Sequence, residues 1–260
     1  MLKIRRLSAP RAVALFLSML ALQATMPARA AEPILVRTAM QSGSLVKYAP
    51  DDAASPGLCL EMLRAVERID PGLRFVGLEL RAPLRRIERL LEQGEIDAFF
   101  CLLKSPERAR QWRYLPVPLY RIRQMAVQRM SDSTELRSMA DLVAAGAKKP
   151  VLVAQGTLLA ETLQRANVAF GFAPSEREAL QMLQLGRTDV VYGQDLNLLR
   201  NIRAADLGDR VRLSATVFQE DIQYATVSKQ MSPDLALRLT QALQQLERDG
   251  SLRTIAEKYK

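Results

Sequence analysis

The sequence contains no histidine, and this absence excludes much of the chemistry that protein side chains can perform. Without histidine there is no Ser-His-Asp or Cys-His nucleophile pair, no imidazole general base and no histidine-ligated metal. The two cysteines are too few for a four-thiolate zinc site. We therefore expect no cofactor and no metal, and only enzymes that use carboxylate, lysine, serine or tyrosine side chains stay possible.

Gly156 and Thr157 follow a predicted strand at 150–154 and open a predicted helix at 157–165. Free backbone amides at the start of a helix attract anions, so this junction is a candidate anion site. The alternative is that Thr157 is an ordinary N-cap residue that binds the first amides of the helix. The two interpretations are compatible.

Residues 1–30 have the pattern of an export signal. A basic start precedes the apolar run 12–22, and Ala28 and Ala30 supply the small residues that a signal peptidase reads. The run is short of the ~20 residues that span a bilayer. We expect Sec-dependent export, cleavage near Ala30 and a periplasmic mature protein. A retained anchor, or a first helix of the domain, is the alternative.

The charge of the chain argues against nucleic-acid binding. The formal net charge is +9, but residues 1–30 hold five basic residues and no acidic one, so the remaining 230 residues carry +4. Arginine and glutamate interleave between 81 and 95, as on a solvated helix face, whereas a nucleic-acid reader needs a dense basic stripe. We expect a small-molecule ligand and no nucleic-acid partner.

Strand-like and helix-like segments alternate along the chain, which predicts an α/β layer structure. The expected strands cover 34–39, 73–80, 96–102, 150–154, 168–172 and 189–192. The expected helices cover 58–69, 157–165, 175–185, a segment from Pro83 to the glycine cap at Gly94, and a C-terminal helix pair within 234–259. The continuous apolar run 96–102 predicts a parallel strand that is buried on both faces.

The pattern L-x-x-G-x-x-D occurs at 91–97 and again at 183–189. Each copy reads as a helix end, a glycine cap and a tight entry into a strand. Because each copy ends a β-α-β-α series, the repeat predicts two similar lobes in one chain.

Two strand-like, moderately polar stretches, 119–129 and 221–229, can link these lobes. We therefore expect lobe 1 to comprise residues 31–124 and 223–260, and lobe 2 to be inserted as residues 125–222. Two connections of this kind make a hinge and leave a cleft between the lobes.

Five stretches in this order resemble the periplasmic solute-binding proteins of the polar-amino-acid family (family 3), the receptors that feed ABC importers. The stretches are 57–62, 91–97, Ser105-Pro-Glu-Arg108 with 114–120, 153–157, and 249–259. The resemblance covers residues 33–260. It implies a two-lobed periplasmic-binding-protein-like fold of type II with a hinge of two crossing strands. It also implies a monomer that is not an enzyme and that delivers an amino acid or similar solute to a membrane-embedded ABC permease.

The resemblance assigns the carboxylate of the ligand to Arg108, the arginine of the S/T-P-x-R stretch. Arginine suits this role because its planar fork donates two parallel hydrogen bonds to one carboxylate. Ser105 and the backbone around Leu103 would add donors, and Gly156 and Thr157 would form the second half of the clamp. The alternative is that Arg108 is one of several surface arginines.

The sequence departs from the family at the position that meets the ammonium group of the ligand. Gln194 stands where the family has an aspartate, and Asp195 comes one residue later. A one-residue shift in an extended segment reverses the side-chain direction. Either a bulge at Gly193 delivers Asp195, or no carboxylate meets the ammonium group. In the first loop, Tyr48 is a candidate to stack on the ligand, although the usual aromatic motif is missing. The expected ligand is therefore a small polar carboxylate-bearing solute.

Cys59 lies at a helix start and Cys101 near a strand end, and in an α/β lobe both sites face the same edge. Export allows a disulfide between them. Two buried thiols are the alternative, which only geometry can decide.

Two other functions stay open. Some exported relatives of this fold are cyclohexadienyl dehydratases, which remove water and carbon dioxide from a prephenate-type acid and need a general acid, for which Glu61 and Asp195 are candidates. The fold also occurs as the sensor domain of histidine kinases. No apolar spanning run is found before Lys260, so we expect the receptor.

Overall fold

The computed structural model describes residues 32–260, so the predicted signal peptide and its cleavage position lie outside the described residues. The strands are β1 (Ile34–Arg37), β2 (Met40–Gln41), β3 (Leu73–Val76), β4 (Arg81–Ala82), β5 (Ala98–Leu103), β6 (Arg113–Arg129), β7 (Val151–Ala154), β8 (Phe170–Ala173), β9 (Val191–Gln194), β10 (Val211–Leu213) and β11 (Gln219–Val227). The helices are α1 (Leu58–Ile69), α2 (Leu84–Gln93), α3 (Pro106–Gln111), α4 (Met139–Lys148), α5 (Leu159–Arg165), α6 (Glu176–Gln184), α7 (Asp195–Ala204), α8 (Pro233–Arg248) and α9 (Ser251–Glu257).

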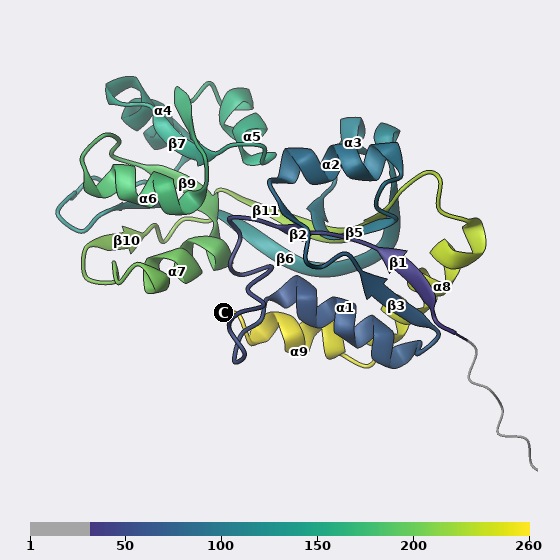
Figure 1. Cartoon of the computed structure of the whole chain (residues 1–260). Coiled ribbons are helices and arrows are strands. Elements are labelled where there is room, and N and C mark those ends of the chain that lie inside the picture. The colour runs from purple at the N-terminus through teal and green to yellow at the C-terminus, as the bar shows by residue number, and fades with distance from the viewer. Residues whose placement is uncertain (1–31) are drawn as a thin grey trace, which may run out of the picture. The chain divides into compact units, whose positions relative to one another are not determined.

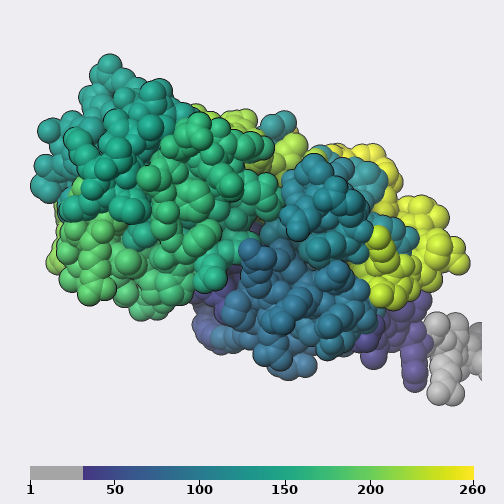
Figure 2. All heavy atoms as spheres, turned by 90° about the horizontal axis from the view of Figure 1, so that it is seen from above, coloured from purple at the N-terminus to yellow at the C-terminus, as the bar shows by residue number. Residues whose placement is uncertain are grey.

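Two long antiparallel strands, β6 and β11, run through the middle of a seven-stranded sheet (Figure 1). The sheet order is β5-β11-β6-β9-β7-β8, with β10 beside β6. The elements of 139–213 gather at one end of these two strands, and α1 to α3 with α8 and α9 gather at the other (Figure 1). In the space-filling view the teal and green residues likewise lie to one side of the blue ones (Figure 2). The predicted α/β fold of two lobes is confirmed.

The helices form where apolar residues recur on one face. In α2 the buried side chains are Leu84, Ile87, Leu90 and Leu91, and Gly94 ends the helix in the left-handed conformation with φ 73°. Gly186 after α6 has φ 70°, so both glycines of the sequence repeat have the backbone of a helix C-cap. The repeat therefore marks two equivalent helix-to-strand connections.

The strand at 98–103 corrects one expectation. All six residues of β5 are buried, but its partner in the sheet, β11, is antiparallel. Helices α1 and α2 pack on β5, and their cover gives continuous burial without parallel pairing. Parallel pairing is found instead between β1 and β3, between β2 and β4, and between β7 and its neighbours β8 and β9.

A disulfide links Cys59 in α1 to Cys101 in β5, with an S–S distance of 1.99 Å and a Cα–Cα distance of 6.1 Å. It closes a loop with a sequence separation of 42, and both residues are fully buried. The disulfide fixes the start of α1 against the middle of the β5 strand. Among residues 32–260, none of the helices combines the length and apolar character that a bilayer crossing requires.

Candidate functional site

A cavity of about 490 Å³, here called the first cavity, lies where loops of both halves of the sheet meet. Its walls come from the loop after β2, the end of β5, the segment 154–158 after β7, the start of α6, the end of β9 and α7. The charged side chains that line it are Lys47, Arg108, Glu176, Arg177 and Glu178. Its volume is within the range of ~300–1,000 Å³ that is usual for small-molecule sites.

Lys47 is a buried cation that lines the first cavity, with 5 % of its surface exposed. Its Nζ donates to the carbonyl oxygen of Cys101 at 2.9 Å, and its own carbonyl accepts from the amide of Cys59 at 3.1 Å. The two disulfide-linked cysteines therefore hold both ends of this residue. Burial, with repulsion from Arg108 as the second cause, lowers the pKa of Lys47 to about 7.

Glu176 is the buried acid of the first cavity, with 3 % of its surface exposed. It lies in the first turn of α6, which Ser175 caps. Its carboxylate accepts from the backbone amide of Gln194 at 3.2 Å and from the side-chain amide of Asn197. Burial raises the pKa of Glu176 to about 7, although the Gln194 amide and the charge of Lys47 both lower it.

Polar contacts join the first loop to α7 across the cavity. The hydroxyl of Ser44 donates to Asn197 Oδ1 at 3.1 Å, and the other end of that amide is the one that binds Glu176. Arg200 of α7 forms an ion pair with Asp52 of the same loop. The loop that holds Lys47 is therefore in direct contact with the helix next to Glu176.

Two amide oxygens at the cavity have no hydrogen-bond partner within the described part of the chain. They are Oε1 of Gln41 and Oε1 of Gln223, and both residues line the cavity. Gln223 is fully buried, and its nitrogen donates to Gln194 Oε1 at 3.3 Å. Buried acceptors are rarely left unfilled, so these oxygens are places where a ligand N–H group would bind favourably.

Arg108 is buried and lines the first cavity, so it is not a solvent-facing surface arginine. Its guanidinium already has partners in the chain: an ion pair with Glu88 of α2, and hydrogen bonds to the carbonyl oxygens of Leu103 at 3.1 Å and Gly156 at 3.4 Å. The carbonyl oxygens of Leu103 and Gly156 therefore orient the Arg108 guanidinium. Ser105 accepts from the Arg108 amide at 3.2 Å as the N-cap of α3.

The junction after β7 differs from the expectation. Helix α5 begins at Leu159 with Leu158 at the N-cap position, so Thr157 is not the N-cap residue. The hydroxyl of Thr157 donates back to the carbonyl oxygen of Ala154 at 2.9 Å. Thr157 lines both the first cavity and a neighbouring cavity of about 530 Å³, whereas Gly156 and Ser105 line only the neighbouring one of these two.

Gln194 lines the first cavity and Asp195 does not. Strand β9 runs through Gly193 to Gln194 without a bulge, and α7 begins at Asp195. The Asp195 carboxylate accepts from the backbone amide of Arg123 at 3.1 Å and from its Nε at 2.8 Å. Asp195 is therefore an ion-pair partner of β6 and does not face the cavity.

Two further candidates lie away from the cavities. Tyr48 is a core residue whose ring stacks on Phe99 and whose hydroxyl donates to the carbonyl oxygen of Phe100 at 3.3 Å. Glu61 accepts from the hydroxyl of Tyr259 at 2.5 Å and forms an ion pair with Lys258. Tyr48 is therefore not a stacking platform for a ligand, and Glu61 is not a general acid for one.

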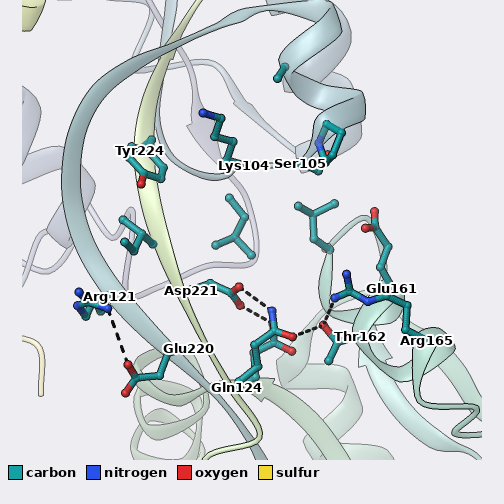
Figure 3. A pocket seen from close by; sticks show the side chains of 16 residues that line it. Lys104, Ser105, Arg121, Gln124, Glu161, Thr162, Arg165, Glu220, Asp221 and Tyr224 are labelled. Carbon is teal, nitrogen blue, oxygen red and sulfur yellow. Dashed lines mark hydrogen bonds and ion pairs between the residues drawn. The ribbon is translucent and has the colours of Figure 1, made fainter.

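A second cavity of about 610 Å³ lies along β6, β11, α3 and α5 (Figure 3). Its polar groups are largely bound to each other: Gln124 and Gln219 both donate to Asp221, and Arg121 faces Glu220 at 3.8 Å. The charged side chains in its wall are exposed or half-buried, whereas Lys47 and Glu176 of the first cavity are buried. The first cavity is therefore the stronger candidate for a specific site.

Sequence reasoning did not identify Lys47, Glu176, Asn197 or Gln223. Lys47 follows a loop rich in serine and glycine, and Glu176 follows a helix-capping serine, so both read as exposed positions. One available signal was Gly193, because a Cβ there would lie 2.7 Å from Glu176 Oε1. The glycine at 193 can thus indicate that a side chain from elsewhere in the fold, here Glu176, occupies the space that a Cβ would fill.

Comparison with solved structures places the fold. A histidine kinase sensor domain with similarity to periplasmic binding proteins superposes with a TM-score of 0.73 and 19 % identity, covering 87 % of this chain and 95 % of that one. An ancestral arginine-binding protein bound to arginine superposes with a TM-score of 0.70 and 21 % identity, covering 86 % of this chain and 97 % of that one. An ancestral amino-acid-binding protein, a precursor of cyclohexadienyl dehydratase, superposes with a TM-score of 0.68 and 18 % identity, covering 86 % of this chain and 94 % of that one.

The chain has the fold of the periplasmic binding proteins. No protein-family model matches the chain, and none of the curated proteins matches its sequence. At these identities the likeness establishes the fold, and the ligand has to be argued from the residues of the first cavity.

Proposed function

We propose that this protein is an extracytoplasmic receptor that binds a small carboxylate-bearing solute, most simply an amino acid, in the first cavity. The main support is that Lys47, a buried amine with no ion-pair partner among residues 32–260, lines a cavity of about 490 Å³ together with Arg108. Buried cations are stabilised by an anion that enters with them, so a carboxylate is the expected partner. Amino-acid-binding proteins of the same fold are consistent with this ligand class.

We infer the lobes from the same arrangement. Residues 31–124 and 223–260 would form lobe 1 and residues 125–222 lobe 2, with β6 and β11 as the hinge. The contacts of Ser44 with Asn197 and of Asp52 with Arg200 would then be contacts between lobes that form on closure. The export pattern of residues 1–30 supports a periplasmic location. We propose that the protein acts there as a monomer and hands its solute to an ABC permease.

The receptor role is tested by thermal unfolding of the mature protein with the twenty amino acids and a set of small organic acids. A ligand at one hundred times its Kd stabilises the native state by about 2.7 kcal/mol, which raises the midpoint by several degrees. Calorimetric titration of each hit gives the Kd. If no compound shifts the midpoint, the receptor proposal is wrong in its ligand class. Uptake of the labelled hit by cells with and without this protein tests delivery to a permease.

A second candidate function is suggested by Glu176. A buried carboxyl group whose pKa is raised to about 7 can hold a proton near neutral pH and donate it. A dehydratase acting on a prephenate-type acid needs such a donor, and one solved structure of this fold is a precursor of cyclohexadienyl dehydratase. Incubation with prephenate and detection of an aromatic product discriminates this enzyme from a receptor. A product that disappears in Glu176→Gln would support the enzyme.

A further inference from the structure

The first cavity holds two buried charges of opposite sign, Lys47 and Glu176, that attract each other but form no ion pair within 4 Å with each other or with any other described residue. Lys47 is held by the backbone of Cys101, and Glu176 by the amides of Gln194 and Asn197. Burying a charge without an opposite charge beside it is costly, and the cost is removed when a partner arrives. These two groups are therefore the ones that gain most from a ligand.

The charged groups that the sequence pattern had favoured are already neutralised within the chain. Arg108 forms an ion pair with Glu88, and Asp195 forms one with Arg123. A ligand carboxylate at Arg108 competes with Glu88, whereas a carboxylate at Lys47 displaces no acidic side chain. The unsatisfied charge in the cavity is thus on Lys47 and Glu176.

The unused hydrogen-bond donors and acceptors of the cavity also lie at Lys47 and at Glu176. The ammonium group of Lys47 has three N–H donors, and one of them is used by Cys101. On the acceptor side, Glu176 offers carboxylate lone pairs, and Gln223 Oε1 is buried without a partner within residues 32–260. The cavity therefore offers donors for an anion and acceptors for an ammonium group.

We propose that the solute is a zwitterion whose carboxylate binds Lys47 and whose ammonium group binds Glu176, with Gln223 Oε1 as a second acceptor. This inference rests on the proposed receptor function, because it names the two charged groups of the solute and the residues that bind them. It restores an acidic partner for an ammonium group although Gln194 occupies the position where the family places an aspartate. The acid comes from the start of α6 and not from the end of β9.

The absence of a side chain at Gly193 makes room for Glu176 in this arrangement. A Cβ at this position would lie 2.7 Å from Glu176 Oε1 and 2.8 Å from Leu198 Cδ2. The missing side chain leaves the space in which the Glu176 carboxylate lies against the Gln194 amide.

The test is calorimetric titration with three sets of matched probes. Each set contains an amino acid, its α-deaminated analogue and its decarboxylated analogue: L-glutamate, glutarate and 4-aminobutyrate; L-glutamine, 5-amino-5-oxopentanoate and 4-aminobutanamide; L-arginine, 5-guanidinopentanoate and agmatine. The wild-type protein should bind at least one amino acid tenfold or more tightly than both of its analogues.

Two variants test which residue binds the carboxylate and which binds the ammonium group of the solute. Glu176→Gln should weaken the amino acid about thirty-fold or more and leave the deaminated analogue within about three-fold, since that analogue has no ammonium group. Lys47→Met should weaken the amino acid by a similar factor and leave the decarboxylated analogue nearly unchanged. Lys148→Met and Glu247→Gln, at exposed positions outside the first cavity, are matched controls and should change neither ratio.

The outcomes separate this inference from the proposed function. If a deaminated analogue binds as tightly as its amino acid, or if Glu176→Gln weakens both equally while its urea midpoint is unchanged, the zwitterion assignment is wrong and the receptor stands. If Arg108→Ala alone abolishes binding and Lys47→Met does not affect it, the carboxylate end is misassigned. If no probe and no compound of the wider panel binds, both the inference and the receptor proposal fail.

Discussion

The substitution Lys47→Met gives a direct measure of what burial does to the charge in the first cavity. Methionine keeps most of the length of the lysine side chain and removes the amine. In the folded protein the pKa of Lys47 is about 7, against an ordinary value of 10.5. Each pKa unit corresponds to about 1.4 kcal/mol, so the protonated amine costs the folded state roughly 5 kcal/mol below pH 7.

The sign of the pH dependence follows from this lowered pKa. Between pH 7 and 10.5 the unfolded chain binds a proton that the folded chain does not, so wild-type stability rises with pH over this window. At pH 9 the penalty has fallen to roughly 2 kcal/mol. The variant lacks this term. Losing Lys47 also removes an attraction that lowers the pKa of Glu176, which disfavours the variant further at high pH.

We therefore expect the advantage of Lys47→Met over wild type to shrink by about 3 kcal/mol between pH 6 and pH 9. Changes in packing, and the loss of the bond to Cys101, shift both values together and cancel from this difference. The measurement is urea unfolding of both proteins at the two pH values, with the disulfide intact. Lys148→Met serves as the exposed control. If the difference is the same at pH 6 and pH 9 within about 0.5 kcal/mol, Lys47 has an ordinary pKa and the reasoning is refuted.

Three further predictions concern the same region. Replacing Cys59 and Cys101 by serine should lower the free energy of unfolding by about 4 kcal/mol, because the closed loop has a sequence separation of 42; urea titration checks this, and a loss under 1 kcal/mol would contradict it. Gly193→Ala should cost about 1–3 kcal/mol because its Cβ meets Glu176 and Leu198, whereas Gly208→Ala, with nothing within 4 Å, should stay within about 0.5 kcal/mol; equal midpoints would speak against the close approach. Amino-acid binding should be tightest near pH 7 and weaken on both sides, because Glu176 has to be ionised to bind the ammonium group and Lys47 protonated to bind the carboxylate, and both pKa values are about 7; a flat calorimetric profile from pH 5 to 9 would exclude these groups.

The fold could be predicted from the sequence because its signals are local. The bounds of α1 agree with the apolar periodicity, Ser175 caps α6 as expected, and Gly94 has the left-handed conformation that its position after a helix predicted. The order of these elements is a property of the chain alone. It was sufficient for the α/β class and for the repeat that suggests two lobes.

The site could be predicted only in part, because its chemistry depends on contacts between distant residues. The sequence pattern predicted Arg108 as a binding-site residue, and Arg108 does line the cavity. Its ion pair with Glu88 could not be predicted, because it depends on how α2 packs beside α3. Asp195 was a candidate by spacing, yet α7 begins at that residue and turns its carboxylate to Arg123. Glu176 has the sequence context of a solvated first helical turn, and only its tertiary neighbours bury it.

The way Lys47 is held has a practical consequence for anyone who prepares this protein. Its backbone carbonyl accepts a hydrogen bond from the amide of Cys59, and its amine donates one to the carbonyl oxygen of Cys101. A disulfide joins these two cysteines. Material made in a reducing cytosol would lack the disulfide, and with it the covalent link between the two groups that hold Lys47. The Lys47 amine would then no longer be held in place by a covalently fixed carbonyl, so free thiols should be assayed before any ligand screen is judged negative.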